Sequence, residues 1–274
     1  TSTVWMSGVF NSMLTQGHVS VNRFLSAARS YLGLFRSHGQ RLFVDAGDGW
    51  RLLDEPSAFE ITPEACRWHY KHEAGLIRVE SRALTETHEL RLSIDVLSGA
   101  PLRFLLSNRI ALDGDDGVEA AAARYERDGE GVFVLPNADS EVGRRFPHGG
   151  FRIDLSPGAS LERVAGDEAL FPDGVSRREP FLCLIVAPAS SICFRIQGRL
   201  LAPEPAAALE TDRYWRGMSL GLRILAPADG PLAKDAARLS EILPWFAQNA
   251  LVHYLAPRGL EQFSGGGWGA RDVA

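Results

Sequence analysis

The sequence predicts a mainly β protein: a large antiparallel β-sandwich over residues 1–227, followed by helices over residues 228–274. From Val4 to about Ala226, apolar and polar residues mostly alternate with a period of two, as in strands with one buried face. Clusters of Gly, Pro, Asp and Ser separate these stretches, and such punctuation favours a sandwich over alternating strand and helix units. After Pro231 the apolar period changes to that of a helix.

Four stretches show the alternation most clearly, and each is predicted to be a half-buried antiparallel strand. They are Leu90–Val96, Phe151–Leu155, Ile192–Ile196 and Met218–Ile224. Phe181–Val186 differs because it is apolar on both faces. That run predicts a central strand that is buried between two layers.

Turn signals lie between these stretches, where Gly, Pro and Asp permit tight changes of direction. They are Asp45–Gly49, Ser98–Pro101, Asp113–Gly117, Ser156–Gly158 and Pro203–Pro205. Two segments interrupt the strand pattern. Val21–Leu34 fits either a helix or irregular structure, and the acidic segment Leu161–Leu170 is ambiguous.

An apolar stripe at helical spacing runs from Leu239 to Tyr254, and residues 245–262 are predicted to be a helix that Pro257 and Gly259 close. Pro244 is expected to kink this stretch or divide it into two helices, because proline lacks the backbone donor and clashes with the preceding turn. We place the domain boundary near residue 227. The stripe has nothing after it in the chain to cover it, which suggests a further helical domain.

The composition excludes several classes of protein. A net charge of −5 argues against a nucleic-acid partner, which would favour a basic surface. The three cysteines show no disulfide framework and suggest a reducing compartment. No apolar run reaches the about 18 residues of a membrane span, and the start shows no secretion signal. We therefore expect a cytoplasmic protein with no membrane partner.

Several chemically suggestive groups have simpler explanations. Cys66, His69 and His72 are residue types that bind zinc, but in a strand His69 faces away from the other two, so no metal site is expected. The acidic residues at 113–119 lack the alternating ligands of a calcium loop and suggest a solvated turn. His253 alone is more typical of a satisfied core histidine than of a catalytic residue.

The candidate binding residues are Trp268, Arg271 and Asp272, which follow flexible glycines near the end of the sequence. One alternative is a flexible tail in which these side chains are neighbours by chance. The other is a sugar site: an indole stacks on a pyranose ring, while guanidinium and carboxylate groups bind its hydroxyls. Spacing alone does not separate the two.

The segment Asn249–Asp272 resembles the opening of the catalytic barrel in glycoside hydrolase family 94, the glycoside phosphorylases. The 1,2-β-oligoglucan phosphorylase branch is the most similar. Segments near the start resemble the same branch: Trp5–Ser12, Gly39–Val44, Pro56–Glu60 and Cys66–Trp68. The resemblance spans the chain and is diffuse in the middle.

The resemblance implies a β-sandwich, linker helices and the first helix of an (α/α)6 barrel whose remainder is not in this sequence. It places Arg271, Asp272 and Trp268 at the subsite for the sugar whose bond is cleaved. The implied reaction is a reversible, inverting phosphorolysis of β-glucosides, with β-1,2-glucooligosaccharides giving α-glucose 1-phosphate. Phosphate is the co-substrate and no cofactor is implied. The general acid is expected beyond Ala274, so no catalytic residue is assigned and this segment alone is expected to be inactive.

The resemblance also implies that the sandwich supports the barrel and mediates homodimer contacts. Two other functions stay open. The chain could be a non-catalytic carbohydrate-binding or dimerisation module, or it could be the phosphorylase-like part of a cyclic β-1,2-glucan synthase.

Overall fold

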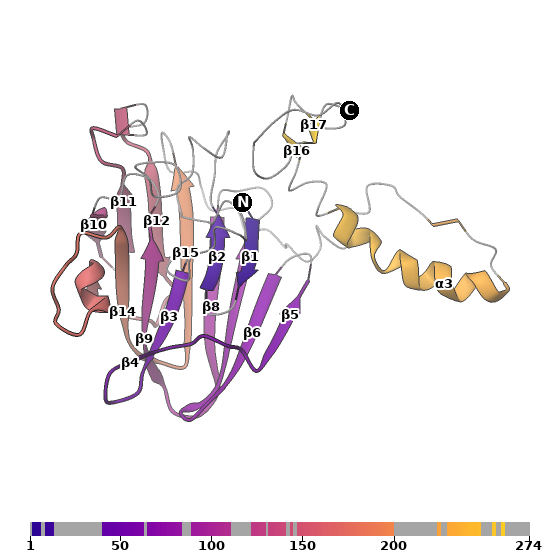
Figure 1. Ribbon diagram of the computed structural model, residues 1–274, viewed down its shortest axis with the longest axis horizontal. Helices are drawn as coiled ribbons and strands as arrows, with labels where there is room; N and C mark the ends of the chain where they lie inside the picture. The colour runs from indigo at the N-terminus through magenta and orange to yellow at the C-terminus, as the bar shows by residue number, and fades with distance from the viewer. Residues whose placement is uncertain are drawn as a thin grey trace. The chain divides into compact units, whose positions relative to one another are not determined.

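The computed structural model describes most of residues 40–199 and shorter parts of the chain on either side (Figure 1). The described residues are 2–6, 9–13, 40–62, 65–83, 89–110, 122–129, 131–140, 143–144, 147–199, 224–225, 229–247, 254–255 and 259–260. The chain divides into two compact units. One comprises Thr1–Ile61 and Ala65–Ala207, and the other comprises Thr62–Glu64 and Ala208–Ala274. The boundary expected near residue 227 stays a prediction.

Within the described residues, the first unit contains two antiparallel sheets, one of seven strands and one of eight. The seven-stranded sheet consists of β1 (Ser2–Met6), β2 (Val9–Met13), β3 (Gln40–Asp45), β9 (Leu102–Arg109), β14 (Phe181–Ala189) and β13 (Leu161–Ala165), with β4 (Trp50–Leu52) paired to β3. The eight-stranded sheet runs in the order β10 (Arg124–Asp128), β11 (Gly131–Leu135), β12 (Gly150–Leu155), β15 (Ser191–Arg199), β8 (Glu89–Ser98), β7 (Gly75–Ala83), β6 (Ala65–His72) and β5 (Ala58–Ile61). The mainly β sandwich prediction is confirmed.

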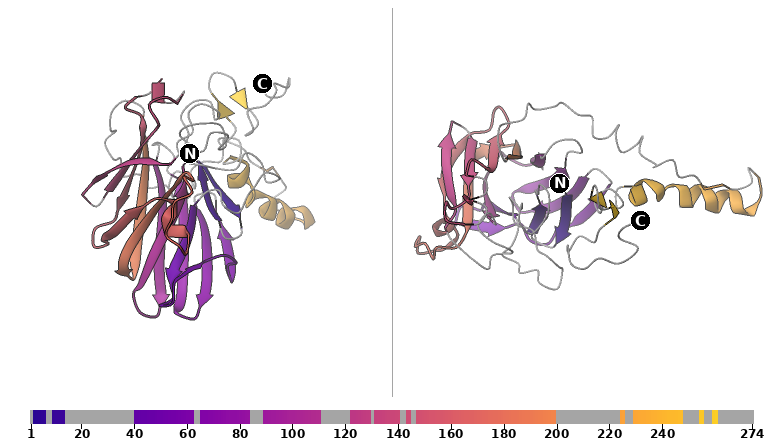
Figure 2. Two further views of the ribbon diagram at one scale, coloured as in Figure 1. Left: turned by 60° about the vertical axis from the view of Figure 1, so that its left-hand side comes forward. Right: turned by 90° about the horizontal axis from the view of Figure 1, so that it is seen from above.

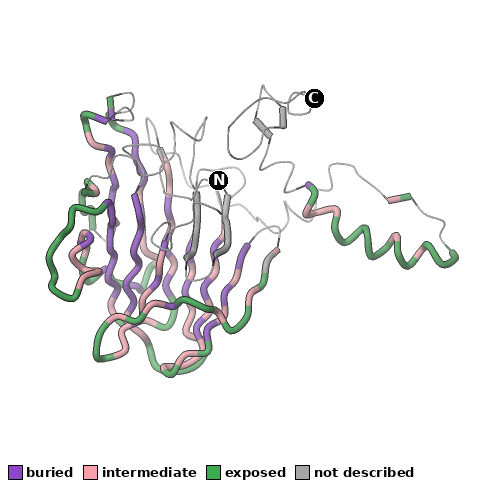
Figure 3. The backbone as a smooth tube through the Cα atoms, in the orientation of Figure 1, coloured by how far each residue is buried: buried purple, intermediate pink, exposed green. Residues whose placement is uncertain are grey.

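The sheets face each other across one hydrophobic core (Figure 2). Buried residues alternate with more exposed ones along the strands, as Figure 3 shows for the purple and pink segments. Large core side chains come from both sheets, among them Phe104 of β9 and Phe194 of β15, which are almost fully buried. The period-two alternation in the sequence is therefore the cause of the sandwich, because it gives each sheet one apolar face to bury.

Strand β14 is buried on both faces, as its continuous apolar run predicts. Its side chains Leu182 and Leu184 enter the main core, whereas Cys183 and Ile185 belong to a second apolar cluster on the other face. The short 3-10 helix η2 (Asp167–Leu170) covers that second cluster. The ambiguous segment at residues 161–170 thus consists of β13 followed by η2.

The three other strands predicted within the described residues are confirmed as β8, β12 and β15. The turn signals at 45–49, 98–101 and 156–158 each join two of the observed strands. Gly99 shows why one turn needs glycine, because its φ is 110° and an added Cβ would lie 2.3 Å from the carbonyl oxygen of Ala74. The strand predicted at 218–224 and the segments 21–34, 113–117 and 203–205 lie outside the described residues, apart from Ile224.

The second unit contains helix α3 (Pro231–Ser240), which begins with a proline at its first position and follows Gly230. A turn at 241–242 ends it, and helical structure resumes at 243–247 with Pro244 in the new first turn. The prediction that Pro244 divides this stretch is therefore confirmed. Leu239, Ile242 and Phe246 of the apolar stripe are exposed.

The helix predicted over 245–262 is wrong beyond residue 247 in the described part of the chain. Tyr254–Leu255 forms β16 and Gly259–Leu260 forms β17, and the two pair as antiparallel strands. The physical reason lies between them, since Pro257 lacks a backbone donor and biases the residue before it towards extended backbone. These local preferences outweigh the helical spacing of the apolar side chains.

Candidate functional site

The predicted binding residues Trp268, Arg271 and Asp272 lie outside the described residues, so their role stays a prediction. His253 and the acidic segment 113–119 lie outside them as well.

The Cys66-to-His72 group lies on β6, and the strand separates its side chains as predicted. Cys66 is buried in the core beside Trp68. His69 points to the opposite face, where its Nε2 lies 2.9 Å from Oε1 of Glu60. The three residue types that suggested zinc therefore do not converge on one point.

The outer face of the eight-stranded sheet is highly charged, and arginine and carboxylate side chains pair across it. Nitrogen–oxygen distances are 2.5 Å for Arg67 with Glu80, 2.9 Å for Arg78 with Asp95, and 3.6 Å for Arg195 with Asp154. Such cross-strand pairs stabilise neighbouring strands modestly and leave few free donors or acceptors. This charged face is explained by sheet pairing.

A second polar cluster surrounds Arg103 on β9. Its Nε and Nη2 donate to Glu162 at 2.8 and 2.5 Å, and its Nη1 donates to Oδ2 of Asp45 at 3.1 Å. The guanidinium carbon also lies 5.1 Å from the ring centre of Trp50. Aromatic, cationic and acidic groups can together bind sugars, but here they bind one another and clamp β3, β4, β9 and β13 together.

The same contacts explain the acidity of Asp45. The backbone N–H of Gly47 donates to its carboxylate at 2.9 Å, and with Arg103 this lowers the pKa of Asp45 below its ordinary value. The ionised Asp45 side chain therefore stabilises the turn between β3 and β4.

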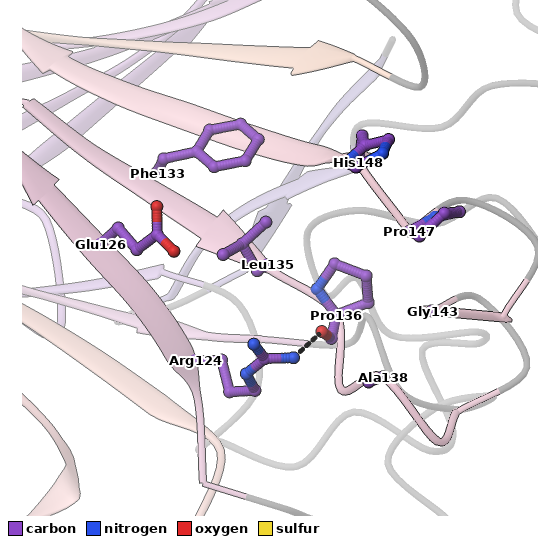
Figure 4. A pocket seen from close by; sticks show the side chains of 9 residues that line it. All are labelled: Arg124, Glu126, Phe133, Leu135, Pro136, Ala138, Gly143, Pro147 and His148. Carbon is purple, nitrogen blue, oxygen red and sulfur yellow. Dashed lines mark hydrogen bonds between the residues drawn. The ribbon is translucent and has the colours of Figure 1, made fainter.

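A pocket of about 410 Å³ lies at the β10 edge of the eight-stranded sheet (Figure 4). Its floor consists of two cross-strand pairs, Arg124 opposite Leu135 and Glu126 opposite Phe133. The neighbours of Phe133 along β11 point into the core, so the pocket opens on the outer face of the sandwich. Residues from the segment after β11 complete it: Pro136, Ala138, Gly143, Pro147 and His148.

The wall of the pocket is fixed by a compact turn around Ser140. The Ser140 hydroxyl donates to the carbonyl of Asn137 at 2.7 Å and accepts from the backbone N–H of Gly143 at 2.9 Å. Gly143 itself packs so closely that an added Cβ would lie 1.9 Å from the Asn137 oxygen. The chain therefore requires glycine at this point, and these contacts hold the wall in place.

The polar groups of the pocket differ in how they are satisfied. Arg124 donates from Nη1 to the Pro136 carbonyl at 2.8 Å, which ties the strand to the wall (Figure 4). Glu126 and His148 are exposed and have no hydrogen-bond or ion-pair partner within the described part of the chain. The site thus offers a cation that keeps spare donors, an acidic acceptor, an imidazole and apolar walls.

Sequence reasoning missed this pocket. Its signals were weak: alternating charges at Arg124 and Glu126 are ordinary for a solvated edge strand, and only the prolines at 136 and 147 mark the following segment as constrained. Nothing in the local sequence shows that this segment folds back over Phe133.

Residues 1–198 match the sequence model of a family described as the glycoside phosphorylase supersandwich domain. The chain belongs to this family. The match covers the two-sheet unit almost completely, so the supersandwich is the fold described above. The family resemblance found in the sequence is confirmed at the level of glycoside phosphorylases.

The whole chain is similar to a 1,2-beta-oligoglucan phosphorylase of Listeria innocua, with 26% identity over 275 aligned positions. The chain spans only 25% of the length of that relative. Among solved structures, a polysaccharide lyase matches 72% of this chain and 31% of its own, with 12% identity and a TM-score of 0.38. So distant a likeness supports no argument about the supersandwich domain.

None of the helices in the described residues combines the length and the apolar character that crossing a bilayer requires.

Proposed function

We propose that this supersandwich domain is part of a glycoside phosphorylase that cleaves β-1,2-glucooligosaccharides with inversion. The observation that supports the proposal most strongly is the similarity to a 1,2-beta-oligoglucan phosphorylase along the whole of this chain, together with membership of the supersandwich family. The partners of the reaction are then a β-glucan oligosaccharide and inorganic phosphate, with no cofactor.

In the proposed reaction, a phosphate oxygen attacks the anomeric carbon from the face opposite the glycosidic oxygen. The carbon–oxygen bond breaks, and a carboxylic acid gives its proton to the leaving oxygen, which produces α-glucose 1-phosphate and a shortened glucan. Phosphate is already nucleophilic, so the protein needs no general base. Trp268 stacks on the sugar that is transferred, and Arg271 with Asp272 binds its hydroxyls.

The test uses the intact protein that contains residues 1–274. Incubation with β-1,2-glucooligosaccharides and phosphate is followed by ¹H NMR, which reports the amount and the anomeric configuration of glucose 1-phosphate. Release of the α-anomer supports the proposal. No release from any β-glucan, or release of the β-anomer, overturns it, while residues 1–274 alone are expected to release none.

A matched pair of variants tests the proposed subsite. Arg271→Ala is expected to lower kcat/KM by about 100-fold, the usual effect of removing a donor that stabilises a transition state. Arg258→Ala removes a nearby arginine outside the motif and is expected to leave kcat/KM unchanged. Equal effects of both changes would count against the assignment of Arg271.

The other expectations remain part of the proposal. They are a domain boundary near residue 227, a homodimer formed through the sandwich, and a place in the cytoplasm. An intact protein with no phosphorolysis but with glucan binding or dimerisation would favour the non-catalytic module. Formation of cyclic glucans would favour the synthase.

A further inference from the structure

We infer that the pocket at the β10 edge is a binding site for a neutral glucan chain. The inference rests on the proposed function only for the choice of sugar. Its own basis is the arrangement of Arg124, Glu126, Phe133 and His148 around one preformed cavity (Figure 4).

The size and lining of the pocket suit a sugar. Its volume of about 410 Å³ lies within the range of small-ligand pockets, about 300–1,000 Å³. Phe133 and Leu135 give an apolar surface next to Arg124 and Glu126, which are their direct neighbours across the strands. A pyranose ring has the same combination of apolar ring faces and hydroxyls around its rim.

The charges favour a neutral ligand over an ion. Arg124 and His148 could attract an anion, but the Glu126 carboxylate lines the same cavity and would repel it. A cation would meet the opposite conflict at Arg124. Hydroxyl groups satisfy both kinds of residue, since they accept from guanidinium and imidazole N–H groups and donate to a carboxylate.

The pocket is also prepared for binding. The Ser140 turn and the close packing of Gly143 hold the wall in place, and the Arg124-to-Pro136 hydrogen bond ties the floor to that wall. A ligand therefore displaces water from Glu126 and His148 without rearranging the backbone, which lowers the entropic cost of binding.

The test follows amide hydrogen exchange of the intact protein with and without β-1,2-glucooligosaccharides. Peptides covering residues 131–148 are expected to gain protection when the glucan is added, whereas inorganic phosphate alone gives none there. This local readout separates the pocket from any binding elsewhere in the protein. Protection by phosphate alone, or none from the glucan at saturation, overturns the inference.

A double variant, Glu126→Ala with His148→Ala, removes the two polar groups of the pocket that have no partner in the described part of the chain. Because both side chains are exposed, the fold is expected to survive, and circular dichroism checks this. Loss of two hydrogen bonds to the sugar predicts about tenfold weaker binding at the pocket. Glu55→Ala changes another exposed glutamate elsewhere and is expected to leave the affinity unchanged.

The double variant is expected to phosphorolyse short substrates at the wild-type rate. Unchanged affinity at residues 131–148 in this variant overturns the inference while leaving the proposed function intact. Pocket protection in a protein with no phosphorolysis overturns the proposed function and leaves the binding site.

Discussion

Replacing Asp167 by alanine is expected to release the exposed segment 171–179 from the sandwich. Asp167 is only 2% exposed, and its carboxylate accepts three hydrogen bonds from that segment. The donors are the Ser176 hydroxyl at 2.5 Å and the backbone N–H groups of Arg177 at 2.7 Å and Glu179 at 3.1 Å. Between the two amides lies Arg178, whose φ of 62° is unfavourable for a side chain, so the same carboxylate holds a strained turn.

The magnitude follows from these contacts. Hydrogen bonds to a charged acceptor contribute about 1.5 kcal/mol each at the low end of their range, so losing three lowers the free energy of unfolding by about 4.5 kcal/mol. If the released segment exposes its donors to water, the loss falls to about 2 kcal/mol. Burial alone would raise the pKa of Asp167, but the hydrogen bonds from Ser176, Glu179 and Arg177 outweigh it and lower the pKa below its ordinary 3.8.

The sign of the pH effect follows from that lowered pKa. The stability that Asp167 contributes is fully present above pH 3.8 and is lost as the pH falls through the lower pKa of the folded state. The difference between wild type and Asp167→Ala is therefore expected at pH 7 and shrinks below pH 3.8.

Urea unfolding measures the stability, and limited trypsin digestion reports cleavage after Arg177 and Arg178. The matched control is Asp173→Ala, which removes another carboxylate bound to Arg177 but one that is exposed. The control is expected to unfold like the wild type, since exposed pairs stabilise little. A loss below about 1 kcal/mol for Asp167→Ala, with unchanged trypsin cleavage, would refute the reasoning.

Three further predictions follow from the same unit. Arg103→Met is expected to raise the pKa of Asp45 only part of the way to its ordinary value, because the larger contribution, from the Gly47 N–H, remains. An NMR titration of the Asp45 carboxyl carbon measures this pKa, and a full return to 3.8 would contradict the prediction. Gly99→Ala is expected to destabilise the protein more than Gly47→Ala. Both glycines have a positive φ, but only a Cβ added at Gly99 would meet a backbone oxygen, at 2.3 Å. Thermal unfolding that ranks the two variants the other way would contradict this prediction. Burial raises the pKa of Cys183 to about 12, so this thiol is expected to resist alkylation of the folded protein at pH 8, as mass spectrometry of labelled peptides can show.

The sandwich was predictable because the pattern of apolar residues along each strand follows directly from which of its faces are buried. Alternation at Leu90–Val96 marks one buried face, and the run Phe181–Val186 marks two. Both patterns arise from burial, and each strand was found where the pattern placed it. The pairing order was not predictable, since β3 joins β9 and β9 joins β14 through contacts far apart in the sequence.

The C-terminal part shows the limit of periodicity. The apolar spacing towards Tyr254 fits a helix, yet Tyr254 pairs with Leu260 across Pro257. Helical spacing describes which side chains could share a face, whereas proline removes a donor that the helix needs. The pocket was missed for a different reason: it depends on Gly143 approaching the Asn137 oxygen, a contact that the spacing of residue types does not encode.

In this unit, a ligand site is better located by polar side chains that lack a hydrogen-bond partner in the described structure than by the number of charged side chains on a surface. The face that contains Arg78 and Asp95 has far more charge than the pocket, but a sugar bound there would have to compete with ion pairs already made. The cluster at Arg103 has the aromatic and acidic neighbours of a sugar site, yet Glu162 and Asp45 occupy its donors. At the β10 edge, by contrast, the described structure leaves the Glu126 carboxylate to water, beside a buried aromatic ring and within a fixed wall. A glucan that binds there displaces water and does not have to break an ion pair. Its free energy of binding is therefore more favourable at this less charged part of the sheet, which makes the pocket the better candidate.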